Sequence, residues 1–193
     1  QAAKFGRRDP DFEFGTNPCS EIILRPYQFC NLTEVVVRGT DTVDDLERKV
    51  KLATILGTVQ SSFTKFPYLR KVWQRNTEEE RLLGVSLTGI MDNKLLTSKN
   101  KGLEETLEHL REVAVSTNLD YSNRLGIPQS TSITCVKPSG TVSQLVDSAS
   151  GIHARHSNYY VRTVRGDNKD PLTQFMKDQG IPNEPCVFKG DTT

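Results

Sequence analysis

The sequence has little excess charge and no long apolar run, and each shortage excludes a class of protein. Its 25 Lys and Arg residues against 24 Asp and Glu residues leave a net charge of +1. Proteins that coat nucleic acid or anionic membranes need a basic excess. No apolar run approaches the ~18 residues of a membrane span. We therefore expect no membrane association and no direct nucleic-acid binding.

Signals of secretion are also missing. Residues 1–8 contain no apolar signal core, and the four cysteines are too irregularly spaced for a secreted disulfide framework. We expect the protein to lie in the reducing cytoplasm, where a functional cysteine takes part in a reaction and not in a structural disulfide. The chain also lacks an initiator Met, so we expect it to be a piece of a longer protein. Its 193 residues, 35% hydrophobic and 25% charged, are enough for one globular core.

The first two thirds of the chain predict strands and helices in alternation. Short β-branched runs predict strands at 21–24 and 33–37. Apolar residues at helical spacing predict helices over 42–66, 77–92 and 100–125, the second opened by a capping-box pattern.

The rest of the chain continues this alternation. Its expected elements are a strand at 131–136, a short helix at 141–147, a strand at 159–165 and a helix over 170–180. Strands that alternate with helices predict the α/β class with mostly parallel strand pairing.

One five-residue stretch brings together an amide, a thiol and a carboxylate, in Asn17, Cys19 and Glu21. In an extended segment, residues two apart point to the same side, so Cys19 and Glu21 would face one substrate. A second thiol, Cys30, follows eleven residues after the first. Spacing alone leaves open that both thiols are small buried residues beside a strand. Without a CxxC pair, the sequence predicts no metal site.

A small-residue turn follows the expected strand at 131–136 and opens the next helix. Its residues are Pro138, Ser139, Gly140, Thr141, Val142 and Ser143. Backbone N–H groups at a helix start bind phosphate, helped by small residues and hydroxyls. An ordinary capped turn has the same pattern, and the Walker order of residues is absent.

Several motifs, taken in order, resemble those of the ribonucleotide reductases. They lie at 17–22, 30–32, 83–90 (which resembles a helix of that family), 137–143, 151–153 and 159–165. The resemblance implies part of a ten-stranded α/β barrel with a catalytic finger loop. It makes residues 1–193 a partial catalytic barrel domain from the C-terminal half, with 1–16 as a lead-in and 182–193 as a truncated strand region.

The resemblance also implies roles for the site residues. Cys19 matches the cysteine that carries a thiyl radical and abstracts the 3′ hydrogen of a ribose. Glu21 matches the general base for the 3′ hydroxyl, and Asn17 matches the amide that holds the substrate hydroxyls. Cys30 matches one half of a redox-active pair whose partner would lie upstream, outside this sequence. The turn at 138–143 matches the loop that binds the substrate phosphate.

The short spacing from Cys19 to Cys30 resembles the adenosylcobalamin-dependent class II enzymes. This implies adenosylcobalamin as cofactor, bound mainly outside this piece, and ribonucleoside triphosphates as substrates. It also implies thioredoxin or a similar dithiol reductant, and a piece that is inactive alone. Three alternatives stay open: the large subunit of a class I ribonucleoside-diphosphate reductase, a non-catalytic nucleotide-binding fragment, and a thiol oxidoreductase that uses Cys19 and Cys30.

The remaining candidate residues have plainer interpretations. Cys135 lies in an apolar strand and is expected to be structural, while Cys186 has no assigned role. His153 and His156 are expected to be loop residues rather than metal ligands, since no carboxylate accompanies them in register.

Overall fold

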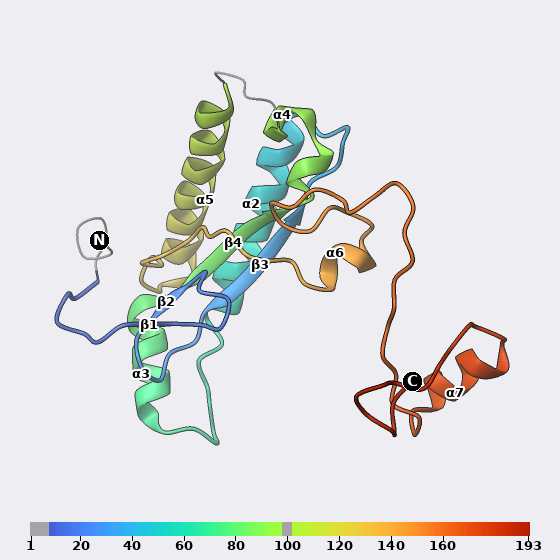
Figure 1. Ribbon diagram of the computed structural model, residues 1–193. Helices are drawn as coiled ribbons and strands as arrows, with labels where there is room; N and C mark the ends of the chain where they lie inside the picture. Colours follow the sequence, from blue (N-terminus) through green and yellow to red (C-terminus); the bar gives the residue numbers. More distant parts are fainter. Residues whose placement is uncertain (1–7, 98–101) are drawn as a thin grey trace. The chain divides into compact units, whose positions relative to one another are not determined.

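The computed structural model describes residues 8–97 and 102–193 and divides into two compact units (Figure 1). The first unit extends to Arg155, and the second is His156–Thr193. The first seven residues of the expected lead-in, and the start of the helix expected over 100–125, lie outside the described residues. The partial barrel domain over the whole chain stays a prediction.

The first unit is built on a parallel pair of strands, β3 (Asn31–Val36) and β4 (Leu83–Thr88). The pairing runs from Asn31 opposite Leu83 to Val36 opposite Thr88. The segment at 131–136 lies along the other edge of β4 and forms one parallel bridge, between Val85 and Thr134. The α/β class is therefore confirmed. The described residues contain no closed sheet, so the barrel remains a prediction.

Helices α2 (Val43–Gln60) and α5 (Leu103–Leu125) pack together against one face of this sheet (Figure 1). Their buried core includes Val35, Val37, Leu46, Val50, Leu83, Val85, Leu110 and Ala114. A capping box between Thr42 and Asp45 begins α2, and a left-handed Gly126 ends α5. Both helices were predicted. The first ends six residues earlier than expected, because Ser61 and Ser62 turn their hydroxyls onto nearby backbone carbonyls.

The helix predicted over 77–92 is wrong. Helix α3 spans Lys71–Glu80, so the acidic run that was expected to open a helix closes one instead. Arg81 follows in the left-handed conformation, and β4 begins at Leu83. A strand forms here because β4 is buried between neighbours on both edges. Gly84 permits this packing, since a Cβ atom there would lie 2.4 Å from Leu32 Cδ2.

Apart from α5, the described residues of the first unit after β4 form three short helices. The 3₁₀ helix η1 spans Ile90–Asp92, α4 spans Lys94–Thr97, and α6 spans Val142–Leu145. The helix expected at 141–147 is therefore a single turn, and the strand expected at 131–136 is reduced to one bridge.

In the second unit, helix α7 (Pro171–Asp178) confirms the predicted helix, and the Asp170 carboxylate accepts from Leu172 N–H at its start. The strand predicted at 159–165 is wrong. No strand forms there in the described residues, and Val161 is 96% exposed because no neighbouring strand pairs with it.

Near the start of the first unit, two short antiparallel strands form a hairpin. They are β1 (Gly15–Thr16) and β2 (Ile23–Leu24), with Thr16 opposite Ile23. The amide, thiol and carboxylate predicted at 17–21 therefore lie in the loop of this hairpin. Among the described helices, none is long and apolar enough to cross a bilayer.

Candidate functional site

The hairpin loop at 17–22, here called the thiol turn, is closed by Asn17. Its backbone N–H donates to Ile22 O at 3.3 Å, and its side-chain Oδ1 accepts from Ile22 N–H at 3.1 Å. Ser20 has φ +60° and donates its N–H to Asn17 O. The expected extended segment is therefore wrong, because these bonds fold it into a turn. Cys19 lies exposed at the tip.

The Glu21 carboxylate has an oxygen with no partner. Its Oε2 atom is buried and makes no hydrogen bond within the described part of the chain. Buried carboxylate oxygens in native proteins usually have a partner, so this one is available to a ligand. Burial raises the pKa of the Cys30 thiol, and the negative charge of Glu21 raises it further. The Glu21 carboxylate therefore lies close enough to the Cys30 thiol for its charge to act on it.

The thiol turn rests on the sheet face opposite the helices. Val85 belongs to the core beneath α2, so its neighbour Gly84 points to the other side. A Cβ atom at Gly84 would lie 3.0 Å from both Ile22 Cδ1 and Cys135 Sγ. Ile22 closes the thiol turn, so this glycine is where the turn and Cys135 approach the sheet together.

Cys135 is the residue that sequence reasoning missed. Burial raises the pKa of its thiol to about 11, and the nearby Glu21 carboxylate and Cys30 thiol add to the effect. This thiol stays protonated at neutral pH, next to two of the predicted site residues. No sequence signal would have found it, because its position depends on the pairing of its segment with β4.

The phosphate turn, residues 138–143, is held from inside by serines. Ser139 is buried, and its hydroxyl accepts from Ser143 N–H at 3.0 Å. Gly140 has φ +57°, and Thr141 is right-handed helical. Within the described residues, the N–H groups of Gly140 and Thr141 donate no hydrogen bond. A left-handed residue followed by a right-handed one directs successive N–H groups into an anion-binding nest.

The nest, and not the helix start predicted from the sequence, is the feature of this turn that can bind an anion. Helix α6 has only four residues, so it contributes little dipole. The turn begins three residues after Cys135, or about 10 Å of extended chain. The phosphate turn therefore starts close to the group formed by Glu21, Cys30 and Cys135.

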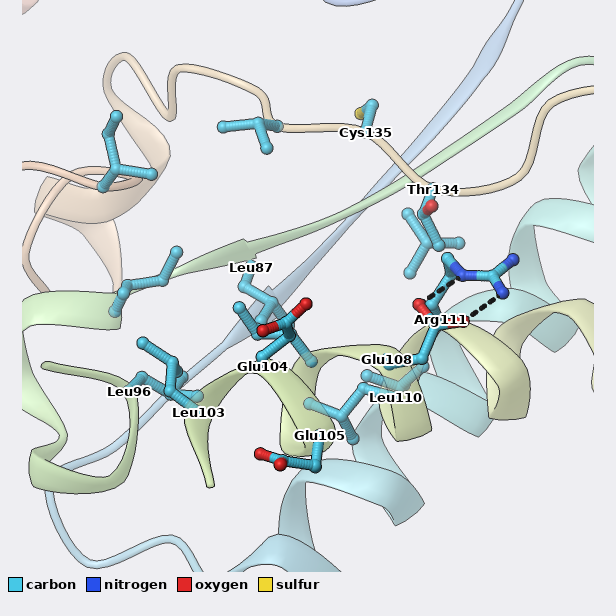
Figure 2. A pocket seen from close by; sticks show the side chains of 16 residues that line it. Leu87, Leu96, Leu103, Glu104, Glu105, Glu108, Leu110, Arg111, Thr134 and Cys135 are labelled. Atoms are coloured by element: carbon cyan, nitrogen blue, oxygen red, sulfur yellow. Dashed lines mark hydrogen bonds and ion pairs between the residues drawn. The ribbon is translucent and has the colours of Figure 1, made fainter. Parts of the chain in front are cut away.

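A large groove in the first unit touches this group only at Cys135. Figure 2 shows this groove of about 1240 Å³, which is lined by leucines and charged residues of α5, by apolar side chains of β4, η1 and α4, and by the segment at 134–136. Arg111 pairs there with Glu108 on the same helix. Cys135 reaches its edge, but Asn17, Cys19 and Glu21 do not line it. The groove therefore meets the candidate group at Cys135 but does not include the thiol turn.

The other candidate residues do not join this site. Across residues 8–97 and 102–193, no three His, Cys, Asp or Glu side chains come together as a cation site. The His153 ring lies 3.3 Å from Ser150 O. In the second unit, the N–H of Phe188 and the guanidinium of Arg165 lower the pKa of Cys186.

No family model matches the chain, but individual relatives do. It is 32% identical to an adenosylcobalamin-dependent ribonucleoside-triphosphate reductase of Lactobacillus gasseri, over 92% of this chain and 27% of that protein. A probable enzyme of the same name from Dictyostelium discoideum is 31% identical, over 92% of this chain and 23% of the relative.

A solved structure agrees with these relatives. The crystal structure of a B12-dependent, class II ribonucleotide reductase superposes with a TM-score of 0.72 and 28% identity, over 95% of this chain and 29% of that one. The chain thus spans about a quarter of the length of the proteins it matches.

Proposed function

We propose that this chain, which is related over nearly its whole length to the class II ribonucleotide reductases, supplies the thiol site of such an enzyme. The whole protein would reduce ribonucleoside triphosphates to 2′-deoxyribonucleotides for DNA synthesis. One observation supports this most: the thiol turn packs over Gly84 beside Cys135, in the segment that leads into the phosphate turn. The chain would form part of a ten-stranded barrel with residues 17–22 as its finger loop.

Each site residue has one step in this proposal. A thiyl radical on Cys19 takes the 3′ hydrogen of the ribose, so the S–H bond forms as the C–H bond breaks. Glu21, with its unpartnered Oε2, accepts the proton of the 3′ hydroxyl. The 2′ hydroxyl leaves as water with a proton from the thiol pair of Cys30, and the second proton and the two electrons of that pair reduce C2′. Cys19 then returns its hydrogen to C3′, which restores the thiyl radical, and Glu21 returns its proton to the 3′ oxygen. Asn17 holds the thiol turn closed through Oδ1, which leaves its amide N–H groups to donate to a substrate hydroxyl.

The electrons for this reduction come from thiols. Cys30 and a second thiol each give up one electron and one proton, and together they form a disulfide as the ribose is reduced. We propose an upstream cysteine, outside this sequence, as that second thiol, and thioredoxin or a similar dithiol as the reductant that restores the pair. Cys135 lies near Cys30, and burial raises the pKa of both thiols, so both are protonated and able to give up hydrogen.

The substrate is held at its other end by phosphate. We propose that residues 138–143 bind it through the N–H groups of Gly140 and Thr141, with hydroxyls of the turn alongside. A nest of this kind binds an anion without a dedicated cation.

Adenosylcobalamin supplies the radical when it is bound. The described residues do not fit this cofactor: Cys19 stands exposed at a turn, and no residue of the thiol turn lines the large groove. We therefore propose that it is held mainly by parts of the protein outside this chain, and that the complete enzyme is cytoplasmic.

The test is the Cys19→Ala variant of the whole protein, assayed with a ribonucleoside triphosphate, adenosylcobalamin and a dithiol. We expect loss of all turnover with nucleotide binding retained. The matched control is Cys186→Ala, a thiol of the second unit, which should keep full turnover. Turnover by Cys19→Ala would contradict the proposal. If the unaltered protein binds the nucleotide but shows no turnover, the non-catalytic alternative is supported.

The same assay separates the two classes of reductase. The relatives carry names of adenosylcobalamin-dependent triphosphate reductases, which favours class II over the class I alternative. Turnover should therefore require added adenosylcobalamin and prefer the triphosphate. The isolated 193-residue chain should give no product.

A further inference from the structure

The buried hydroxyl of Thr88 ties a later segment to the end of β4. It donates to Ala149 O at 3.1 Å and accepts from Gly151 N–H at 2.9 Å. The N–H of Gly89 donates to the same Ala149 carbonyl at 2.8 Å. One side chain that is fully excluded from solvent therefore fixes two positions of a segment more than sixty residues away.

This segment, residues 147–155, lies directly against the phosphate turn, and we call it the strap. Gly151 has φ +54°, and a Cβ atom there would lie 3.1 Å from Lys137 O and 3.7 Å from Ser139 N. At the other end of the turn, Ser148 N–H donates to Ser143 O at 2.9 Å. The strap thus contacts the backbone of the phosphate turn at both of its ends.

A set of ion pairs holds the strap from the other side. Asp92 accepts from Ala149 N–H at 2.8 Å and pairs with Arg155 through both oxygens, at 2.9 and 3.1 Å. Arg155 also reaches the carboxylate and the backbone carbonyl of Asp147. Arg38 donates to that carbonyl as well, at 2.8 Å. Both ends of the strap are therefore attached to the region around Asp92.

We propose that Thr88 and Asp92 are positioning residues for the substrate phosphate, and that they act through the strap. The proposal rests on the proposed function of the phosphate turn. Backbone N–H groups bind an anion well only if they already converge before it arrives, since the ordering cost then falls outside the binding step. Neither residue belongs to the turn, so each would shape the nest without touching the ligand.

The test compares two ligands on the whole protein: a ribonucleoside triphosphate and the nucleoside without phosphate. Asp92→Asn removes the charge that holds Arg155, and Thr88→Val replaces the buried hydroxyl by a group of the same shape. Each variant should weaken binding of the triphosphate about tenfold and leave binding of the nucleoside unchanged. The control is Asp120→Asn, which breaks an exposed pair with Arg124 on α5 and should change neither affinity.

A merely structural role would weaken both ligands together, because general damage does not single out phosphate. Equal losses of affinity for both ligands, or no loss, in a folded Asp92→Asn variant would overturn the proposal. If Thr88→Val fails to fold, the Asp92→Asn variant alone decides the outcome. If the unaltered protein binds nucleoside and triphosphate equally, the phosphate turn itself is misassigned. That result is distinguishable, because it appears before any substitution is made.

Discussion

The two turns of the candidate site are anchored in opposite ways. The stem of the thiol turn is held by a buried ion cluster, in which Arg8 and Arg25 both pair with Glu80. The strap behind the phosphate turn is held on one side by the buried hydroxyl of Thr88 and on the other by an ion pair of Arg155, whose side chain is 48% exposed. Buried charges are costly to unpair, whereas exposed pairs contribute little and are screened by salt. The charged anchor of the thiol turn is therefore expected to contribute more to stability than the charged anchor of the strap.

In the buried cluster both carboxylate oxygens of Glu80, which is 1% exposed, accept hydrogen bonds. Its Oε2 atom accepts from Arg8 Nη2 at 2.7 Å and from Gln28 Nε2 at 2.6 Å. Arg25 Nη2 lies 3.1 Å from Oε1, and Arg8 also donates to Ile23 O, in β2. Segments on both sides of the thiol turn thus meet at one carboxylate at the end of α3.

Glu80→Gln should give the largest loss of stability. It leaves two buried guanidiniums short of a negative charge, which costs about 3–5 kcal/mol when one partner of a buried pair is removed. The measurement is the free energy of unfolding in urea. The control is Glu79→Gln, because the Glu79 side chain is 49% exposed although it also pairs with Arg25; its cost should be about 0–1 kcal/mol. Equal costs would show that the cluster does not anchor the hairpin.

Gly84→Ala should give the next largest effect, at the point where the thiol turn meets the sheet. The new methyl group would lie 2.4 Å from Leu32 Cδ2 and 3.0 Å from Ile22 Cδ1, so strand or turn must shift. Overpacking of this kind costs about 1–3 kcal/mol. Gly15→Ala is the control, since nothing lies within 4 Å of a Cβ atom there. In the whole protein, Gly84→Ala should also reduce turnover, and unchanged stability and turnover would refute the close packing.

Removal of the exposed ion pair between Asp92 and Arg155 should give the smallest loss of stability, and this loss should depend on pH. Hydrogen bonds from Arg155 hold the pKa of Asp92 below its usual range, and the N–H of Ala149 adds to this. A depressed carboxylate pKa contributes stability that is fully present above the unfolded value of about 3.9 and is lost as the pH falls through the folded value. Asp92→Asn should therefore cost about 1 kcal/mol or less at pH 7.

Below about pH 4 the difference between Asp92→Asn and the unaltered chain should shrink. The measurement is the unfolding free energy of both chains from pH 7 to pH 3. A difference that stays constant over this range would mean that the Asp92 carboxylate is not held by Arg155.

The elements that the sequence predicted correctly are those with local signals. Helix α2 begins at a capping box, α5 ends at a glycine, and α7 begins at an aspartate followed by proline. The chemical group formed by Asn17, Cys19 and Glu21 was visible because its members are neighbours in the chain. Each of these signals is complete within a few residues.

The errors arise where distant residues decide the outcome. The acidic run before Arg81 predicts a helix start, but the burial of Glu80 depends on Arg8, 72 residues away. The segment around Gly84 predicts a helix when read locally, because only the pairing of β4 with β3 makes it a strand. The strap was missed for the same reason, since Thr88 and Ala149 are 61 residues apart.

We propose that the Cys19 thiol at the tip of the thiol turn and the backbone N–H groups of Gly140 and Thr141 in the phosphate turn face the same nucleotide. The most direct measurement is the rate at which an alkylating reagent labels Cys19 in the whole protein, followed by mass spectrometry with and without a ribonucleoside triphosphate. We predict that saturating triphosphate slows labelling of Cys19 about tenfold or more and leaves Cys186 unaffected. Unchanged labelling of Cys19 with the nucleotide bound would contradict the claim.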